Sequence, residues 1–276
     1  MKDLIHILRE MGYEPVLKDA ASIFAQSSDA IFLKFGDKIK EDIISNIKSY
    51  NKRPLQDPFP YYSVTKDLFS ELFDDEAASI IIESIRKDML RRINVDTKED
   101  IEKILDAIQK KELFSYLRNM KGHEHIIFLW SKPQLRDNIM KKFFIHSIAP
   151  QGLMSIKEEK PNNIEIVTYK EIFADKENAT ENGFETISEI HKKNTQLIYP
   201  TRLAGIDCTQ WFKQGLTEEF ICLEEKIDKF SEKNKISCIC GYDINKIPDK
   251  KTLKKVIKSH GYVMLDNPHM LFKSGI

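Results

Sequence analysis

The sequence has little glycine, proline or cysteine, with 10, 10 and 4 of these residues among 276. Such low glycine and proline contents exclude collagen-like and low-complexity proteins, and a hydrophobic share of 41% is enough to build a core. The four cysteines, with no regular spacing, exclude a disulfide scaffold and predict reduced, mostly buried thiols. The length favours two domains, because one domain usually holds roughly 100 to 200 residues.

The sequence also lacks an excess of charge and any long apolar run. Its 43 Lys and Arg are balanced by 43 Asp and Glu, so no overall field attracts nucleic acid or an anionic membrane. The basic run at 86–92 is typical of a solvated helix face, with nucleic-acid binding as the alternative. No run approaches the roughly 20 apolar residues of a membrane span, and the N-terminus has no signal-peptide pattern. We therefore expect a cytoplasmic protein with no membrane partner.

Helical periodicity dominates the first 95 residues. Apolar positions predict amphipathic helices over 4–11, 39–47, 64–73 and 77–93. Three prolines in RPLQDPFP, at 53–60, separate the second of these helices from the third, and the segment at 15–26 has no assignable pattern. These features predict an all-α domain over 1–95.

A long helix is expected to follow this domain. Thr97 and Asp100 resemble a capping box at its start, and Gly122 lies just past its end. The apolar stripe shifts between Ile108 and Leu113, so the two halves are expected to pack against different surroundings. The segment 96–122 is therefore interpreted as a connector, with an ordinary packing helix or a homodimer contact through 97–120 as alternatives.

From residue 123 onward, short β-rich runs alternate with helical ones. Strands are expected at 126–130, 152–156, 164–169, 197–205, 236–242 and 262–265. Helices are expected at 133–148, 183–194, 208–215, 217–233 and 249–260. Continuous apolar strands that alternate with helices predict an α/β domain over 123–276, with a mainly parallel sheet covered on both faces.

The junction SKPQLRDN, at 131–138, follows the first expected strand, where α/β proteins often bind ligands. It contains no glycine and lacks the Lys-Ser/Thr pair of a nucleotide-hydrolysing loop, and Pro133 removes one amide donor. Lys132 is still a candidate for contact with an acidic ligand, although a solvated charge at a helix start is the common alternative.

The segment RLAGIDCTQWF, at 202–212, is the densest group of potentially functional side chains. Arg202 could bind a carboxylate or phosphate as a fork, Asp207 lies close by in the sequence, and Trp211 could form the floor of an apolar pocket. The alternative is an ion pair of Arg202 with Asp207 beside a core tryptophan. Together with Lys132, these three residues form the predicted ligand-binding set, and no motif identifies a catalytic residue.

Two pairs of metal-ligating residues have a spacing of two, which directs both members of a pair to one face of a strand. They are His123 with His125 and Cys238 with Cys240. Neighbouring strands could combine them into a His2Cys2 zinc site. However, neither pair has the spacing of a zinc module, and cysteine is often buried as a small hydrophobe. No metal or cofactor is therefore predicted.

Four segments of the C-terminal half resemble the MEDS (methanogen and methylotroph sensory) domain: HEHIIFLW, TRLAGIDCTQWF, FICLEEKIDKF and ISCICGYDINKIPDKKTLKKVIKSHGYVML. The positions that match are His125, Ile126, Arg202, Gly205, Ile206, Asp207, Trp211, Cys240, Tyr242, Asp243 and His260. Where the family usually has His-Pro, this sequence has His260-Gly261. The resemblance covers about 123–268 and implies a relative of the RecA- and KaiC-type ATPases that has lost the phosphate loop and senses small organic molecules.

Residues Asp29 to Ile93 resemble a helical output domain of archaeal signalling proteins, through FLKFGDKIKEDIISNIKSY and DLFSELFDDEAASIIIESIRKDMLRRI. This resemblance implies a signalling role. The sequence therefore predicts a non-catalytic signalling or regulatory protein that responds to a small molecule or a protein partner. The alternative is a divergent nucleotide-binding protein or ATPase that uses Lys132 and Arg202 on phosphates.

Overall fold

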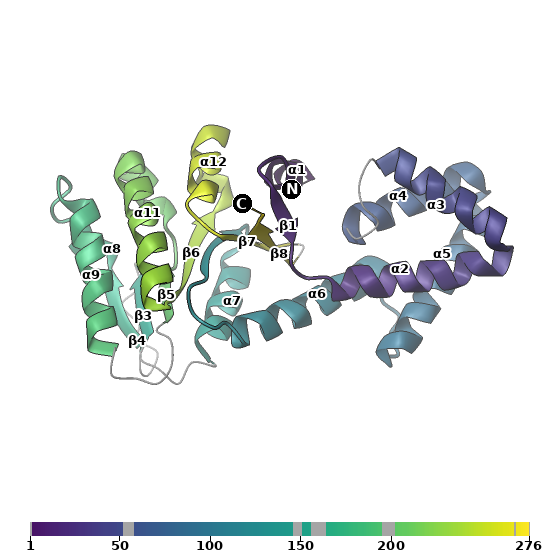
Figure 1. Cartoon of the computed structure of the whole chain (residues 1–276), viewed down its shortest axis with the longest axis horizontal. Helices are drawn as coiled ribbons and strands as arrows, with labels where there is room; N and C mark the ends of the chain where they lie inside the picture. Colours follow the sequence, from purple (N-terminus) through teal and green to yellow (C-terminus); the bar gives the residue numbers. More distant parts are fainter. Residues whose placement is uncertain are drawn as a thin grey trace. The chain divides into compact units, whose positions relative to one another are not determined.

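The structure is a computed structural model that describes residues 2–51, 58–145, 151–155, 164–194, 202–267 and 269–275. The chain forms two compact units (Figure 1). The first contains Met1–Val16 and Leu113–Ile276, and the second contains Leu17–Glu112. Among the described helices, none combines the length and apolar character needed to cross a membrane.

The first unit is mixed α/β and is built on a single sheet. Its described strands are β1 (Tyr13–Pro15), β2 (His125–Trp130), β3 (Gln151–Ser155), β4 (Ile164–Thr168), β5 (Arg202–Gly205), β6 (Ser237–Asp243), β7 (Tyr262–Asp266) and β8 (His269–Ser274). Their order across the sheet is β1-β8-β7-β2-β6-β5-β3-β4. The strands from β7 to β4 run parallel, whereas β8 is antiparallel to both of its neighbours.

Helices cover both faces of this sheet. They are α1 (Lys2–Glu10), α7 (Pro133–Ile145), α8 (Tyr169–Ile172), α9 (Ala179–Asn194), α10 (Thr209–Lys213), α11 (Thr217–Asn234) and α12 (Lys250–Lys258), with a 3-10 turn η2 (Ile244–Lys246). Gly241 of β6 faces Met140 of α7, while the next residue, Tyr242, faces Glu224 of α11. Because consecutive strand residues point to opposite faces, α7 and α11 lie on opposite sides of β6.

The described residues of the second unit form helices. They are α2 (Asp19–Phe32), η1 (Leu33–Phe35), α3 (Asp37–Asn51), α4 (Pro58–Leu72), α5 (Asp75–Ile93) and the first part of α6 (Ile101–Arg118). Edge-on aromatic pairs lie at the centre of its core, with ring centroids of Phe32 and Phe69 5.6 Å apart. The last turns of α6 belong to the first unit, so this helix runs from one unit into the other.

The parallel strands lie where the sequence predicts them, with ends shifted by a few residues. The positions 146–148, 156 and 197–201 of expected elements lie outside the described residues. The segment at 15–26 that has no clear sequence pattern contains the start of α2 at Asp19. At the start of α6, the side chain of Asp100 accepts a hydrogen bond from the amide of Lys103 at 3.0 Å, so Asp100 rather than Thr97 caps this helix.

The prediction of a helical domain over 1–95 is wrong at its beginning. Strand β1 pairs with β8, Tyr13 lying opposite Ser274, so the first 16 residues belong to the α/β unit. Neither strand is among those expected from the sequence. A strand of three residues, Tyr13–Pro15, is too short to show the alternation by which strands are recognised.

Candidate functional site

Four metal-ligating side chains meet on the face of the sheet covered by α11. They are His125 of β2, Glu224 of α11, Cys240 of β6 and His260, two residues beyond α12. Strands β2 and β6 are parallel neighbours with His125 opposite Cys238, which brings Cys240 close to the histidine ring. All four side chains are buried, and one donor atom from each lies within 4.8 Å of the others.

Glu224 is at the centre of this four-residue cluster. Its Oε2 atom lies 3.1 Å from Nε2 of His125 and 3.5 Å from Nε2 of His260. The Sγ atom of Cys240 is 3.4 Å from the same oxygen and 3.5 Å from Nε2 of His125. The other carboxylate oxygen, Oε1, accepts a 2.5 Å hydrogen bond from the hydroxyl of Tyr242. Three potential metal-ligating atoms therefore surround a single carboxylate oxygen.

The outer nitrogen of each imidazole has its own partner. Nδ1 of His125 lies 3.3 Å from Oδ1 of Asp228, one helical turn beyond Glu224 on α11. Nδ1 of His260 lies 2.7 Å from the carbonyl oxygen of Val256. A carbonyl only accepts, so this His260 nitrogen carries a proton, and in the neutral ring Nε2 has a lone pair directed at the cluster.

Burial and neighbouring charges shift the pKa values of the two histidines in opposite directions. Burial disfavours the charged form of His125, but hydrogen bonds to Asp228 and Glu224 outweigh it and raise the pKa to about 9. Burial and the charge on His125 lower the pKa of His260 to about 4. For Glu224, burial opposes ionisation, yet the two imidazoles lower the pKa to about 2. At neutral pH and without a metal, the cluster is thus a His125–Glu224 ion pair beside a neutral His260.

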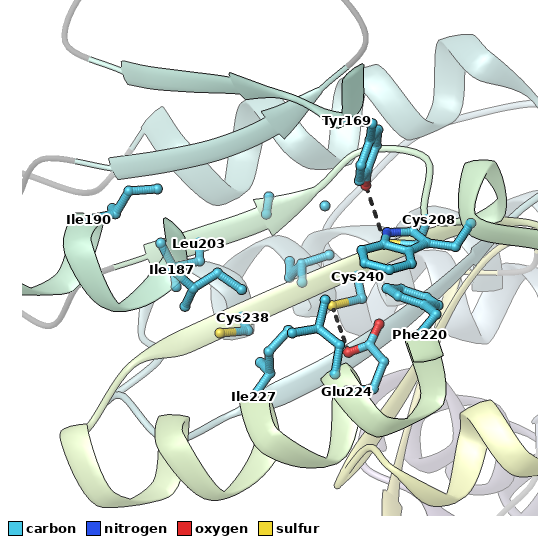
Figure 2. A pocket seen from close by; sticks show the side chains of 15 residues that line it. Tyr169, Ile187, Ile190, Leu203, Cys208, Phe220, Glu224, Ile227, Cys238 and Cys240 are labelled. Carbon is cyan, nitrogen blue, oxygen red and sulfur yellow. Dashed lines mark hydrogen bonds between the residues drawn. The ribbon is translucent and has the colours of Figure 1, made fainter. Parts of the chain in front are cut away.

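A small cavity of about 30 Å³ adjoins the cluster (Figure 2). Its walls come from β5, β6, α8, α9, α10 and α11, and both Glu224 and Cys240 contribute to them. The rest of the lining is mostly apolar, including Ile187, Ile190, Leu203, Leu223 and Ile227. One water molecule needs a cavity of about 10–15 Å³, so this cavity holds roughly two or three small atoms.

Cysteine and tyrosine groups line the part of the cavity next to the ends of β5 and β6. The hydroxyl of Tyr169 lies 3.5 Å from Sγ of Cys208 (Figure 2). Gly205 makes room for this pair, since a Cβ there would lie 2.6 Å from the same sulfur. A hydrogen bond with Cys208 and burial together hold the pKa of Cys240 well above its ordinary range, so without a metal its thiol is protonated.

Trp211 is the one residue of the predicted ligand-binding set that lines this cavity. It is fully buried, and its ring stacks on Phe220 with centroids 4.8 Å apart. Arg202 is buried at the amino end of β5, where it donates to the carbonyl oxygens of Phe143, at 2.5 Å, and Arg118, at 3.2 Å. These carbonyls lie in the last turns of α7 and α6, where helices leave acceptors unpaired. Arg202 therefore anchors two helix ends and does not pair with Asp207.

Lys132 and Arg202 lie at opposite ends of the parallel strands. Arg202 is opposite Ser237 at the start of β6, whereas Lys132 is exposed just beyond Trp130, which is opposite Asp243 at the end of β6. A pocket shared by Lys132, Arg202 and Trp211 is therefore not formed.

The side chain of Asp207 contacts nearby polar groups and does not line the cavity. Its side chain accepts hydrogen bonds from Thr209 and, at 2.7 Å, from Gln210. The Nζ atom of Lys246 lies 3.9 Å away. These contacts make Asp207 part of the turn that follows β5.

Half of the His2Cys2 arrangement that the sequence allows, but does not predict, is present. His123 is exposed, and Cys238 is buried against Ser231, with 3.7 Å between sulfur and oxygen. Only His125 and Cys240 meet, and the sequence reasoning missed the contribution of Glu224 and His260. One signal for Glu224 was available, because it lies four residues after Phe220 and three before Ile227, on the apolar stripe of its helix.

The sequence matches no family model and no curated protein. Among solved structures, the chain is similar to the cytoplasmic domain of EssC, with 8% sequence identity and a TM-score of 0.33. The match covers 70% of this chain and 46% of that one, so this chain spans less than half of that structure. A similarity at this level carries no argument about function.

Proposed function

We propose that the chain is a non-catalytic, cytoplasmic signalling or regulatory protein whose MEDS-like α/β unit binds a small ligand and is coupled to the helical unit. The observation that carries this proposal is the cavity between the sheet and its covering helices. Its walls are mostly apolar, with a few polar groups from Tyr169, Cys208 and Glu224. Ligand sites usually combine an apolar lining with a small number of polar groups in this way.

In this proposal the α/β unit is a RecA- and KaiC-like three-layer domain without a phosphate loop. The parallel strands and the helices on both faces support this interpretation. The contacts at the β2–α7 junction support it further, because the amide of Ser131 donates to the buried carboxylate of Asp266 at 2.8 Å. The hydroxyl of Ser131 lies 3.1 Å from the same oxygen. A negative charge already placed at this junction disfavours a phosphate there.

The size of the cavity indicates the class of ligand. A volume of about 30 Å³ excludes a nucleotide and suits a molecule of very few heavy atoms. The lining offers no cation to pair with an anionic ligand, because its members are apolar residues, cysteines, Tyr169 and Glu224. The preferred ligand is therefore a small neutral molecule, and dichloromethane is a probe of suitable size.

Coupling to the helical unit is proposed to run through β5 and α6. Leu203, Ala204 and Gly205 of β5 line the cavity, and the preceding Arg202 donates to the carbonyl of Arg118 at the end of α6. Helix α6 continues from there into the helical unit. A ligand acts through this route only if it binds two states of β5 with different affinity.

The test is a titration of the full ¹⁵N-labelled chain with dichloromethane, followed by amide chemical shifts. We expect saturable shifts at the cavity lining and their loss in Ile187→Phe, which fills the cavity. Ile80→Phe, on the exposed face of α5, is the matched control and should leave them unchanged. Wild-type protein without saturable shifts would refute ligand binding at this cavity. Binding or turnover of ATP with magnesium would instead support the alternative of a divergent nucleotide-binding protein.

The coupling needs its own measurement, because a ligand can bind without acting on the helical unit. Small-angle scattering of the full chain, with and without saturating dichloromethane, is expected to differ. Identical scattering curves, together with saturable binding, would refute the coupling and leave only a binding function.

A further inference from the structure

We propose that His125, Glu224, Cys240 and His260 form a binding site for one zinc ion. This inference is independent of ligand sensing, since it depends only on the side chains of the cluster. The ion would lie within the α/β unit, between α11, the neighbouring strands β2 and β6, and the turn after α12.

Four of the six distances between the donor atoms fit a tetrahedral centre, and the other two pairs, both with His260, lie within 4.8 Å. Zinc binds nitrogen and oxygen at about 2.0–2.2 Å and sulfur at about 2.3 Å, which separates tetrahedral N and O donors by about 3.3 Å and pairs with sulfur by about 3.5 Å. The two observed N–O distances to Glu224 are 3.1 and 3.5 Å. The sulfur of Cys240 lies 3.4 Å from that oxygen and 3.5 Å from Nε2 of His125. These four distances therefore already suit the ion.

The inner nitrogen of His260 provides a second line of evidence. Within the described part of the chain, its Nε2 is buried and has no hydrogen-bond partner. Because Nδ1 donates to Val256, this nitrogen has a lone pair that faces the Glu224 carboxylate at 3.5 Å. Two acceptors that face each other in a dry interior are unfavourable. A cation between them removes the conflict.

The outer contacts are those that metal-bound histidines usually have. Such ligands donate their second ring N–H to a carboxylate or a backbone carbonyl, which fixes the ring and its tautomer. Here His125 faces Asp228 and His260 faces the carbonyl of Val256. Tyr242 holds Oε1 of Glu224, which leaves Oε2 for the ion.

The chemistry of the donors selects the metal. Thiolate and imidazole suit zinc, whereas magnesium and calcium prefer sites made of oxygen atoms. On binding, the Cys240 thiol and the His125 imidazolium each release a proton to solvent, and the ion takes their place. One thiolate, one carboxylate and two neutral imidazoles then balance the two positive charges. With four protein ligands in a buried site, the ion would be structural rather than catalytic.

The first test is the metal content of the full chain, purified with added zinc and then dialysed. We expect about one zinc per chain and a lower melting temperature once a strong chelator has removed it. Folded wild-type protein that retains only substoichiometric zinc would overturn the proposal.

Cobalt substitution identifies the ligands. Wild-type protein loaded with cobalt(II) is expected to show a thiolate-to-cobalt charge-transfer band and the visible absorption of a tetrahedral centre. The band should disappear in Cys240→Ser and persist in Cys238→Ser, a matched buried cysteine on the same face of β6. A band that survives in folded Cys240→Ser would show that the thiolate comes from elsewhere, which overturns the assignment.

Cys240→Ser is a core substitution that can impair folding, so a milder variant provides an independent test. Asp228 contacts the outer nitrogen of His125, and its side chain is 49% exposed. Loss of such an outer partner usually weakens metal binding about 10- to 100-fold, which competition with a chromophoric chelator measures. We expect this loss for Asp228→Asn and none for Glu225→Gln, an exposed neighbour on the same helix. Equal zinc affinity in both variants would contradict the site.

Discussion

The imidazole rings of His125 and His260 lie 4.0 Å apart and direct their Nε2 atoms at the same oxygen of Glu224. One ring comes from an inner strand and the other from the turn after α12. Since α11 supplies the carboxylate between them, this contact ties three elements together in the core of the α/β unit. The stability of that unit is therefore expected to depend on Glu224.

Glu224→Gln should destabilise the metal-free α/β unit by about 3–5 kcal/mol, because it removes the nearer of the two carboxylates that face the buried His125. Urea unfolding with a chelator present, followed by circular dichroism, measures the change. The exposed Glu225→Gln on the same helix should change stability by less than about 0.5 kcal/mol. Similar losses in the two variants would contradict a special role for the buried carboxylate.

Tyr13→Phe should loosen the N-terminal segment from the rest of the α/β unit. The buried hydroxyl of Tyr13 donates to the carbonyl oxygens of Ile257 at 2.8 Å and His260 at 2.6 Å. Its removal leaves both acceptors without this partner, at a cost of about 1–3 kcal/mol in the free energy of unfolding. Hydrogen exchange of the α1–β1 amides should accelerate in this variant but not in Glu14→Gln, the exposed neighbour on β1. Unchanged exchange would show that the segment is held by other contacts.

Asp88→Asn should destabilise the helical unit in a way that depends on pH. The buried Asp88 pairs with Arg91 and Arg92, at 2.5 Å each. Burial raises the pKa of this carboxyl, but the hydrogen bonds and charges of Arg92 and Arg91 outweigh it and lower the pKa overall. We expect a loss of about 1–3 kcal/mol at pH 7.

The sign of the pH dependence follows from this lowered pKa. A carboxylate that is more acidic in the folded state stabilises it above the unfolded pKa, about 3.9, and this contribution disappears as the pH falls through the folded value. The difference between wild type and Asp88→Asn should therefore shrink below about pH 4 in urea unfolding curves. Asp67→Asn, an exposed site on α4, should have little effect at any pH. A difference that stays constant with pH would exclude a charge effect.

Gly241→Ala should be one of the most damaging single substitutions in the sheet. A Cβ at this position would lie 2.7 Å from the backbone oxygen of Ile206 and 3.1 Å from that of Gly205. Backbone cannot give way as a flexible side chain does, so we expect a loss of more than about 3 kcal/mol. Gly261→Ala has no atom within 4 Å of the added carbon and is the control, expected to be near neutral. Thermal melts of the two variants compare them directly.

Much of the α/β unit could be predicted because its central strands are continuous apolar runs, such as IIFLW, which only a sheet covered on both faces accommodates. Strand β8, which starts three residues after β7, was missed although the intervening Asn267-Pro268 is a turn signal. The start of α2 was missed because its cap is not local, since the amides of Lys18 and Asp19 donate to the distant Glu112, and because DAASIFAQ is only weakly periodic.

The candidate site could be predicted only in part. The spacing of two within each His and Cys pair suggested that His125 and Cys240 could meet if their strands were neighbours. Whether the strands are neighbours depends on the strand order, which the local sequence does not encode. Arg202 and Lys132 were grouped because both are cations beside apolar runs. However, Arg202 begins its strand and Lys132 follows the end of another, and parallel strands place such positions at opposite edges.

The contact between Ser131 and Asp266 gives the β2–α7 junction an internal anion. The amide and the hydroxyl that would recognise a ligand there are already satisfied by a carboxylate from β7. To bind an anion at this junction, the chain would first have to lose Asp266, because an added lysine would simply pair with it. A change of this protein toward phosphate binding would therefore begin with the removal of a negative charge, not with the gain of a positive one.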